Sequence, residues 1–589
     1  MSRVAIDPVT RVGGHLRIEV DVTDGSVRDA WSSGTMFRGL EGILRGRDPR
    51  DAWLLAQRVC GTCTGVHALA SVRAVENALG LTVPRNARLL RNILAGAQLV
   101  QDHVVQFYLL QAFDWVDAMS ALRASPGVTA SLATSTSAWP QSSAAHFREV
   151  QDRLAKVVAS GEIGLLANGD WGHPAYALSP EANLLILSHY LEALDWQRRF
   201  MRVHTLLGGK SPHPQTFLVG GMALAPKWGG PNRALPGEHP QQVERNAPIA
   251  LSERGLRVIA DLIAEARVFV DQVYLPDVRL LARAYPEWTA IGAGVGAYLA
   301  FGEFPEEDTA APELFLPRGR VASALSVVEP VDQTRVAETV ARSHYTYDAG
   351  DQALLHPWDG QTTPRYGGPQ PPVTTLENAD RYSWLKAPRY EEAPLEVGPL
   401  ARMLVAYVEG RSPVTSAVDR LVGSLGLQRD ALFSTMGRTL AQAVETQVVV
   451  ERLAGWHDDL TANLATGDVA VANVTAWDPG AWPDVARGWS FGESPKGAVG
   501  HWVTIENRRV SEYQIVDATT WNASPRDAKG RRGPCEEALV GTPIADPARP
   551  LEVLRTVHSF DPCTACAVHA HRPDGEEPVE IRVSGESTR

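Results

Sequence analysis

Cysteine is scarce in this chain, with five residues among 589. So few cysteines exclude the disulfide framework of a typical secreted protein and indicate a reducing compartment. We therefore expect a cytoplasmic protein, associated at most with the inner face of the membrane through its partners. A passenger carried across the membrane by a signal-bearing partner would show the same composition.

Long apolar segments are also absent. No run of eighteen apolar residues occurs, which predicts no transmembrane helix, and the stretch from Met1 to Asp7 lacks the apolar core of a signal peptide. The net charge of −12 argues against nucleic acid or an anionic membrane surface as the main partner. An apolar fraction of 44% and a charged fraction of 21% are typical of a soluble globular protein.

Four of the five cysteines form two Cys-x-x-Cys pairs near opposite ends of the chain, Cys60 with Cys63 and Cys563 with Cys566. Two such pairs can supply four thiolates to one metal site. A structural zinc site is one interpretation, but such sites usually gather their ligands within a few dozen residues. Four soft thiolates also suit nickel, copper(I) or iron–sulfur. A site that needs both ends of the chain favours one cooperative domain with a buried reactive centre.

The pattern of apolar residues predicts a mainly α fold with peripheral β-structure, one large domain over residues 1–569 around a central helix bundle. Alternation on either side of Asp24-Gly25 predicts an N-terminal β-hairpin within residues 4–35. Helical periodicity covers 49–122, 146–158, 180–207, 251–274, 398–425 and 427–467, with a possible break near 432–434. We expect a surface insertion over 124–145, an irregular excursion with short strands over 303–395, and a C-terminal β and turn region over 486–569.

The residues around the two cysteine pairs are specific. The first pair lies in RVCGTCTGVH (58–67) and the second in DPCTACAVH (561–569). Further motifs are DPVTR (7–11), FRGLE (37–41), GGKSPHPQ (208–215), YSWLKAPRY (382–390) and TWNASPRD (520–527). In this order and at these separations they make the chain resemble the large subunit of nickel–iron hydrogenases, from about residue 5 to residue 569.

The resemblance implies a hydrogen-oxidising enzyme with a binuclear centre. Cys60 and Cys563 would be terminal ligands of nickel, while Cys63 and Cys566 would bridge nickel to an iron that carries cyanide and carbon monoxide. Cys563 would be the first acceptor of the proton released from H2. A nearby Mg²⁺ site would use the Glu41 carboxylate, the Ile515 carbonyl and the His569 ring, donors that suit a hard cation.

The resemblance also implies a polar canopy around the iron, formed by Asp102, Pro495, Lys496, Thr519 and Asp561. We expect Lys496 and Thr519 to donate hydrogen bonds to cyanide, and Asp102 to pair with Lys496.

Two histidines are weaker candidates. We expect His67 and His213 to form hydrogen bonds with cysteine sulfurs or on the side of the iron–sulfur clusters.

The chain departs from the family pattern at three places. Gly13 stands where the family usually has a proton-relaying Glu, which resembles an oxygen-tolerant, high-affinity uptake branch of actinobacterial type and requires another proton exit. Lys496 replaces the usual Arg, and our hypothesis is that its pKa falls enough on burial to accept or relay that proton. Asp517-Ala518 replaces a commoner Val-Pro pair and would add a polar group near the canopy.

The family resemblance also implies partners. Because the chain lacks cysteines for further clusters, we expect a small subunit with iron–sulfur clusters and a dimer of such heterodimers. Residues 570–589 resemble a tail that a maturation endopeptidase removes after nickel-insertion chaperones have loaded the metal. A hydrogen sensor and the quinone-module subunit of respiratory complex I are the alternatives; sensors usually lack such a tail, and the complex I subunit has lost the cysteines.

Overall fold

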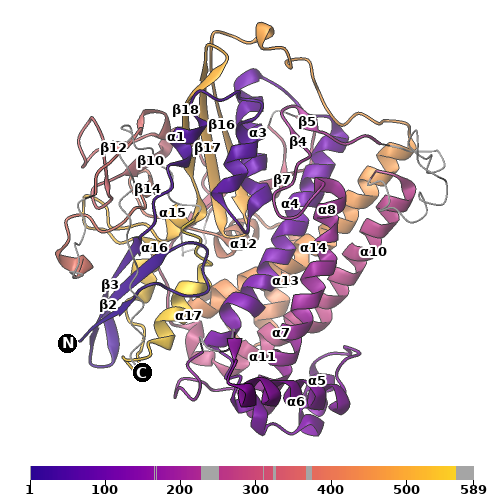
Figure 1. Ribbon diagram of the computed structural model, residues 1–589, viewed down its shortest axis with the longest axis vertical. Coiled ribbons are helices and arrows are strands. Elements are labelled where there is room, and N and C mark those ends of the chain that lie inside the picture. Colours follow the sequence, from indigo (N-terminus) through magenta and orange to yellow (C-terminus); the bar gives the residue numbers. More distant parts are fainter. Residues whose placement is uncertain are drawn as a thin grey trace.

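The computed structural model describes residues 2–164, 166, 169–226, 251–309, 311–322, 327–366 and 375–565. Long helices form its core (Figure 1), and they bury residues at three- and four-residue spacing such as Leu89, Leu90 and Ile93. The main ones are α4 (Arg85–Val105), α7 (Pro180–Phe200), α8 (Arg202–Gly208), α10 (Glu253–Phe269), α11 (Leu275–Ala284), α12 (Pro399–Val408), α13 (Ser412–Ser424) and α14 (Thr435–Ala465). The predicted mainly helical class is confirmed.

The predicted break before α14 is present. A short 3-10 turn covers Arg429–Leu432, and Ser434 caps α14 by accepting a hydrogen bond from the Gly437 N–H at 2.8 Å. Because α14 runs without interruption for 31 residues from this cap, it can contact both α4 and α12.

The surface insertion expected over 124–145 contains a helix, α5 (Pro126–Thr136), and α6 (Ala144–Ser160) follows it. Pro126 opens α5 and Ser125 caps it, accepting from the Val128 N–H. The serines and threonines that suggested a loop instead donate to carbonyls within the helix, as Thr129 Oγ1 does to Ser125 O at 3.0 Å.

Two three-stranded antiparallel sheets flank the helices. The predicted hairpin forms from β2 (Leu16–Thr23) and β3 (Ser26–Gly34), and β1 (Ser2–Ile6) adds a third strand. Asp24 and Gly25 both have positive φ, as a tight hairpin turn between twisted strands requires. The C-terminal strands are β16 (Val485–Ser494), β17 (Gly497–Glu506) and β18 (Arg509–Val516). Helix α3 (Thr64–Leu79) packs against β16 and β17.

Residues 303–395 contain short strands and three short 3-10 helices over their described part. The strands are β7 (Glu303–Pro305), β8 (Leu314–Leu316), β9 (Gly319–Ala322), β10 (Val336–Thr339), β11 (Tyr345–Thr346), β12 (Leu354–Leu355), β13 (Thr363–Pro364) and β14 (Ala387–Tyr390). Four other short strands lie elsewhere: β4 (Phe217–Leu218), β5 (Gly221–Met222), β6 (Ala297–Ala300) and β15 (Glu396–Val397). This arrangement agrees with the irregular excursion that the sequence indicates.

The C-terminal part of the chain returns to the N-terminal sheet. Helix α16 (Pro534–Leu539) packs on β3, where the Ser32 N–H donates to Glu536 Oε1 at 2.9 Å. The Val27 N–H donates to Thr542 O at 2.9 Å, and α17 (Leu551–Ser559) follows. Through these contacts, the segment that follows α17 lies next to the start of α3.

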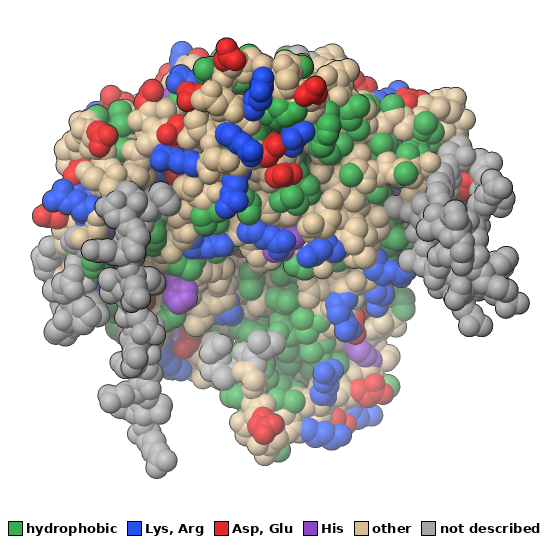
Figure 2. All heavy atoms as spheres, turned by 45° about the horizontal axis from the view of Figure 1, so that its top comes forward, with side chains coloured by type: hydrophobic (Ala, Val, Ile, Leu, Met, Phe, Trp, Pro, Cys, Tyr) green, Lys and Arg blue, Asp and Glu red, His purple; other side chains and the backbone are tan. Residues whose placement is uncertain are grey.

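The exterior carries charges of both signs. On the face that Figure 2 shows, Lys and Arg side chains lie among Asp and Glu side chains instead of forming a patch of one sign. Within the described ranges, no helix is both long enough and apolar enough to cross a bilayer.

Candidate metal centre

The first cysteine pair lies at the start of α3. The short helix α2 (Ala52–Ala56) and a 3-10 turn precede Cys60, and Cys63 is the N-cap residue of α3. The N–H groups of Thr62 and Cys63 both donate to Cys60 Sγ, at 3.3 and 3.0 Å. The Cys60 and Cys63 sulfurs are 2.7 Å apart, which exceeds the roughly 2.04 Å of a disulfide bond. Backbone donors of this kind favour a thiolate over a thiol.

The second pair reaches the first through Cys563. This residue forms a parallel bridge with Gly13, and its N–H donates to Thr519 Oγ1 at 2.9 Å, just after β18. Although 503 residues separate them, the sulfurs of Cys60 and Cys563 are 3.8 Å apart, and both cysteines are 1% exposed. Two sulfurs bound at about 2.3 Å to one tetrahedral metal have this separation. The separation of the Cys60 and Cys563 sulfurs therefore fits a common metal ion, whereas the Cys60 and Cys63 sulfurs, 2.7 Å apart, lie closer together than this geometry requires.

Two polar side chains that the sequence analysis did not single out join the cysteine segments. Arg38, just before α1 (Leu40–Leu44), donates to Val59 O at 2.6 Å and to Ala565 O at 2.8 Å, so it links the two motifs. Gln98 of α4 accepts from the Gly65 N–H at 3.1 Å and donates to Thr62 O at 2.8 Å. Arg38 lies in the FRGLE motif and was therefore within reach of sequence reasoning, whereas no local pattern marks Gln98.

The predicted canopy residues lie together beside the cysteines. Lys496 forms a buried ion pair with Asp561 Oδ1, and the cysteines Cys63 and Cys563 act electrostatically on the same ammonium group. Asp561 Oδ2 and Asp102 Oδ2 are buried without a hydrogen-bond partner among the described residues. Because unpartnered buried oxygens are costly, these two atoms point to a group that the protein atoms do not supply.

Two expectations about the canopy are wrong. Lys496 pairs with Asp561 and not, as predicted, with Asp102. Burial tends to lower the pKa of Lys496, but Asp561 and the neighbouring cysteines outweigh it and hold the pKa above its ordinary value. The pKa of Lys496 thus shifts in the direction opposite to the predicted fall. The sequence could not decide which of two acids the lysine meets.

The third departure from the family pattern has a local role. Asp517 caps α15 (Ala518–Asn522), because its Oδ1 accepts from the Thr520 N–H at 2.9 Å. Burial raises its pKa to about 7.

The predicted magnesium ligands Glu41 and Ile515 are adjacent. Glu41 Oε1 accepts from the Ile515 N–H at 2.9 Å and lies 3.8 Å from Lys386 Nζ, which also pairs with Glu338 at 2.5 Å. Burial raises the pKa of Glu41 to about 7, although Lys386 opposes the shift. Glu338 Oε1 is another buried oxygen without a partner in the described chain. Buried carboxylates around one point suit a hard cation.

The two predicted histidines make backbone or ring contacts. His67 Nδ1 is 3.1 Å from His501 Nε2, and burial lowers the pKa of His67 to about 4. His213 Nε2 donates to Cys60 O at 3.2 Å, so it contacts the backbone of a cysteine and not its sulfur; its predicted place on the side of the iron–sulfur clusters stays a prediction. His67 is the last residue of the motif 58–67, and His213 contacts that motif. His501 is a further buried histidine that only the structure reveals.

Cys566 and His569 lie outside the described residues, as does the tail 570–589. Within the described part of the chain, no group of three His, Cys, Asp or Glu side chains is arranged to hold a metal ion by itself. Cys535, the fifth cysteine, is buried in α16, and burial raises the pKa of its thiol to about 12. Its surroundings thus oppose ionisation.

Comparison with known protein families identifies the family to which this chain belongs. Residues 38–569 match the family described as nickel-dependent hydrogenase, and residues 3–33 match a family described as HoxL-like. The chain belongs to the nickel-dependent hydrogenase family.

Relatives and solved structures agree along nearly the whole chain. The uptake hydrogenase large subunit of Bradyrhizobium diazoefficiens is 45% identical, over 99% of this chain and 97% of the relative. The hydrogenase-1 large chain of Escherichia coli K12 is 43% identical with the same coverage. The Ni-Fe-Se hydrogenase of Desulfovibrio vulgaris Hildenborough, in its as-isolated oxidized state, is 33% identical with a TM-score of 0.75, covering 96% of this chain and all of that one.

These comparisons confirm the family and the enzyme class that the motifs predicted. Family membership implies a nickel–iron centre and a small-subunit partner, which agrees with the convergence of cysteines described above.

Proposed function

We propose that this chain is the catalytic large subunit of an uptake hydrogenase, which oxidises H2 to protons and electrons. The observation that carries the proposal is the 3.8 Å approach of the Cys60 and Cys563 sulfurs beneath unpartnered carboxylate oxygens. The uptake relatives, at 42 to 45% identity over nearly the full chain, support the direction of the reaction.

In this proposal Cys60, Cys63, Cys563 and Cys566 would hold the nickel–iron centre through their sulfurs. Three of the four cysteines are buried, and their sulfurs suit soft metal ions. When bound, the nickel–iron centre, with cyanide and carbon monoxide on its iron, supplies the open coordination position and the redox chemistry that H2 cleavage requires.

The chain's own residues handle the proton. Cys563 Sγ accepts the proton in this proposal, since a ligand sulfur is the base nearest to the metals. Lys496 is held as a cation by Asp561, so it stabilises negative charge on the sulfurs and on the cyanide groups. Gly13 leaves no side chain beside Cys563, and the proton must pass to another group or to water.

The canopy orients the iron ligands. Thr519 Oγ1 accepts from the Cys563 N–H, which leaves its own hydroxyl proton for donation, and Lys496 offers further donors. Asp102 and Pro495 complete this wall.

The magnesium site is a second proposed cation site. Glu41, the Ile515 carbonyl and His569 are the proposed ligands. Lys386 lies beside Glu41 and pairs with Glu338. Glu41→Gln would release Mg²⁺ from the purified enzyme, which metal analysis measures. Retained Mg²⁺ in this variant would exclude Glu41 as a ligand.

The proposal includes assembly. An iron–sulfur small subunit takes the electrons, and a dimer of heterodimers is the expected state. Nickel-insertion chaperones load the centre, and an endopeptidase then removes residues 570–589 after His569. The thiols of the centre suit a reducing compartment, so we place the enzyme in the cytoplasm or at the inner face of the membrane.

The test is H2-dependent reduction of a dye by the purified large and small subunits together. We expect catalytic turnover and infrared bands of bound cyanide and carbon monoxide. Zinc in place of nickel, without these bands, would return the site to the structural zinc interpretation. Slow turnover with an intact centre would indicate the hydrogen sensor.

A further inference from the structure

Lys496 stands on a tight turn. Strands β16 and β17 pair up to Ser494 and Gly497, so Pro495 and Lys496 are the two central residues of a hairpin turn. Two-residue turns constrain the backbone strongly but leave the hairpin tip free to rock unless something packs on it. The direction of the Lys496 side chain therefore depends on how this tip is fixed.

The turn lies against the start of α12. A Cβ at Gly497 would be 2.7 Å from Gly398 N, and a Cβ at Gly398 would be 3.0 Å from Lys496 O. Both glycines have positive φ. Only glycine permits so close an approach of two backbones, so the hairpin tip and the first turn of α12 are in direct contact.

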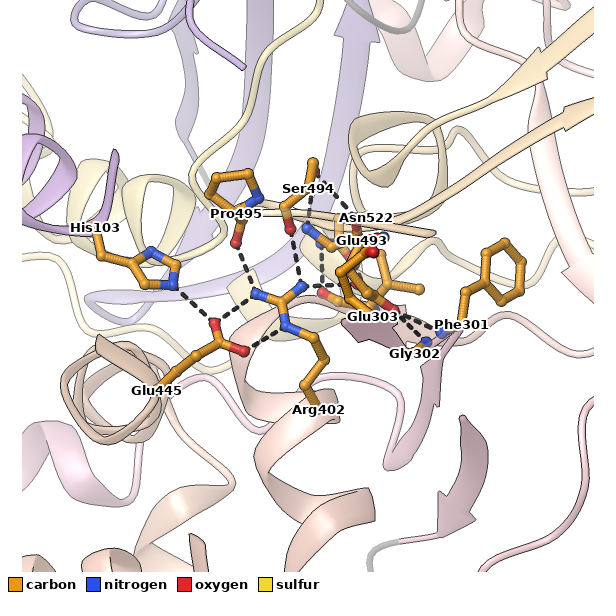
Figure 3. Close-up of polar contacts among 12 residues, drawn as sticks. His103, Phe301, Gly302, Glu303, Arg402, Glu445, Glu493, Ser494, Pro495 and Asn522 are labelled. Carbon is orange, nitrogen blue, oxygen red and sulfur yellow. Dashed lines mark hydrogen bonds and ion pairs between the residues drawn. The ribbon is translucent and has the colours of Figure 1, made fainter. Parts of the chain in front are cut away.

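Arg402, one turn into α12, binds the turn itself. Its Nη1 donates to Ser494 O at 2.9 Å, and its Nη2 donates to Pro495 O at 3.0 Å. Figure 3 shows the guanidinium between these carbonyls and two carboxylates. The side chain is fully buried.

Two carboxylates hold the Arg402 guanidinium in place. Glu445 of α14 accepts from Nε at 2.5 Å and from Nη2 at 2.6 Å, and Glu493 accepts from Nη1 at 2.7 Å. All five N–H donors of the guanidinium are thereby used. Glu445 also meets His103 Nε2 at 2.7 Å.

Glu493 extends the network away from the turn. Its Oε1 accepts from the Phe301 N–H at 2.6 Å, and its own N–H donates to Glu303 Oε2 at 2.9 Å (Figure 3). Glu303 meets Arg73 at 2.7 Å at the edge of a surface cavity of about 760 Å³. The network is thus anchored on the helices and on β7, and no cysteine takes part in its hydrogen bonds.

We propose that Arg402 is a positioning residue, which fixes the Ser494–Gly497 turn and so directs Lys496 toward Asp561 and the cysteines. Its planar fork, which binds two carbonyls and two carboxylates at once, is the feature that lysine cannot reproduce. The role of Lys496 at the metal centre rests on the proposed function. The fixing of the turn by Arg402 rests only on the hydrogen bonds and backbone contacts described above.

The first experiment uses the full chain purified from cells grown without nickel, so it needs no metal centre. Hydrogen exchange would be compared for peptides that cover the Ser494–Gly497 turn. In Arg402→Met we expect the exchange to accelerate by about tenfold or more, because the turn loses its anchors. In Arg402→Lys we expect similar acceleration, because one ammonium cannot replace the fork. Slow exchange in either variant would overturn the proposal.

Arg91 provides the matched control. It is equally buried, pairs with Glu76 through two bonds of 2.6 and 2.9 Å, and donates to the Leu218 and Gly221 carbonyls, but no contact joins it to the turn. Arg91→Met should lower thermal stability and leave exchange at the turn unchanged. Equal acceleration in both Met variants would reduce the Arg402 effect to general destabilisation and contradict the proposal.

The second experiment uses the loaded enzyme. Arg402→Met should shift the cyanide infrared bands in the same direction as Lys496→Met, with nickel and iron retained, whereas Arg91→Met should leave them at the wild-type position. Unshifted bands in a loaded Arg402→Met enzyme would contradict the proposal. Absence of such bands from the wild type would instead count against the proposed function, and the exchange experiment would still decide the role of Arg402.

Discussion

Two buried charged clusters lie side by side and differ in how completely their atoms are partnered. In the first, Arg402 uses all five donors on Glu445, Glu493 and two carbonyls. In the second, Lys496 has Asp561, yet Asp561 and Asp102 each keep a buried oxygen without a partner among the described residues. A guanidinium whose donors are all used maintains the fold, whereas carboxylate oxygens without a partner face something still to be bound. In the first cluster, His103 Nδ1 is the buried atom without a hydrogen-bond partner among the described residues.

The difference also appears in charge. Arg402, with help from His103, lowers the pKa of Glu445 to about 2 against the effect of burial. Burial raises the pKa of Asp102 well above its ordinary value, and Lys496 only partly opposes it. Arg402 therefore favours the ionised form of Glu445, whereas burial favours the neutral form of Asp102, next to the cysteines. Variants in each cluster should therefore differ in their effects on metal binding and on stability.

The largest effect is expected at the cysteines. Cys563→Ala should abolish nickel binding and hydrogen oxidation, because it removes a thiolate that no neighbour replaces. Cys535→Ala is the matched control, since this thiol is equally buried but remote from the pair. Nickel analysis and a dye-reduction assay measure both. Nickel retained at wild-type levels in Cys563→Ala would remove this residue from the ligand set.

The next effect compares the two clusters directly. Glu445→Gln should lower the free energy of unfolding by about 3–5 kcal/mol, because it leaves Arg402 with an incomplete set of buried partners. Asp102→Asn should change it by less than about 1 kcal/mol, because the raised pKa already favours a neutral side chain there. Denaturant unfolding of nickel-free protein would measure both. Equal losses of unfolding free energy in Glu445→Gln and Asp102→Asn would contradict the distinction between the two clusters.

A smaller effect is expected at Gly13. A Cβ there would lie 2.6 Å from Cys563 Sγ, so the sulfur must rotate away, and a sulfur bound to metal cannot rotate freely. Gly13→Ala should reduce nickel content and cost about 1–3 kcal/mol of strain. Gly127→Ala, with open space around its Cβ, is the control and should be neutral in metal content. Full nickel loading of Gly13→Ala would show that the space is not needed.

The smallest effect concerns pH. Burial raises the pKa of Glu493 to about 7 in the folded protein, although Arg402 opposes the shift. In the unfolded chain this carboxyl group has its ordinary pKa of about 4.5, so it loses its proton at a lower pH than in the folded protein. Stability therefore falls with rising pH between these two pKa values. Glu493→Gln should remove about 1 kcal/mol of this decline between about pH 5 and 6. Thermal unfolding at the two pH values tests it, and identical pH slopes for both proteins would contradict the assignment.

The sequence predicts the parts of the site that local motifs encode. The two cysteine pairs, Glu41 with its motif, and Asp561 beside Cys563 all stand in short recognisable stretches. Arg402 and Glu445 do not, because 43 residues separate them and each reads singly as an ordinary helix residue. Helix α5 was missed for a related reason, since serine and threonine favour turns until their hydroxyls bond within a helix.

The most direct measurement is the metal content and infrared spectrum of the mature enzyme purified with its small subunit. The account predicts one nickel and one iron per large subunit, with bands of bound cyanide and carbon monoxide that disappear in Cys563→Ala and persist in Cys535→Ala. A folded wild-type protein that contains zinc or no metal at the cysteines would contradict it.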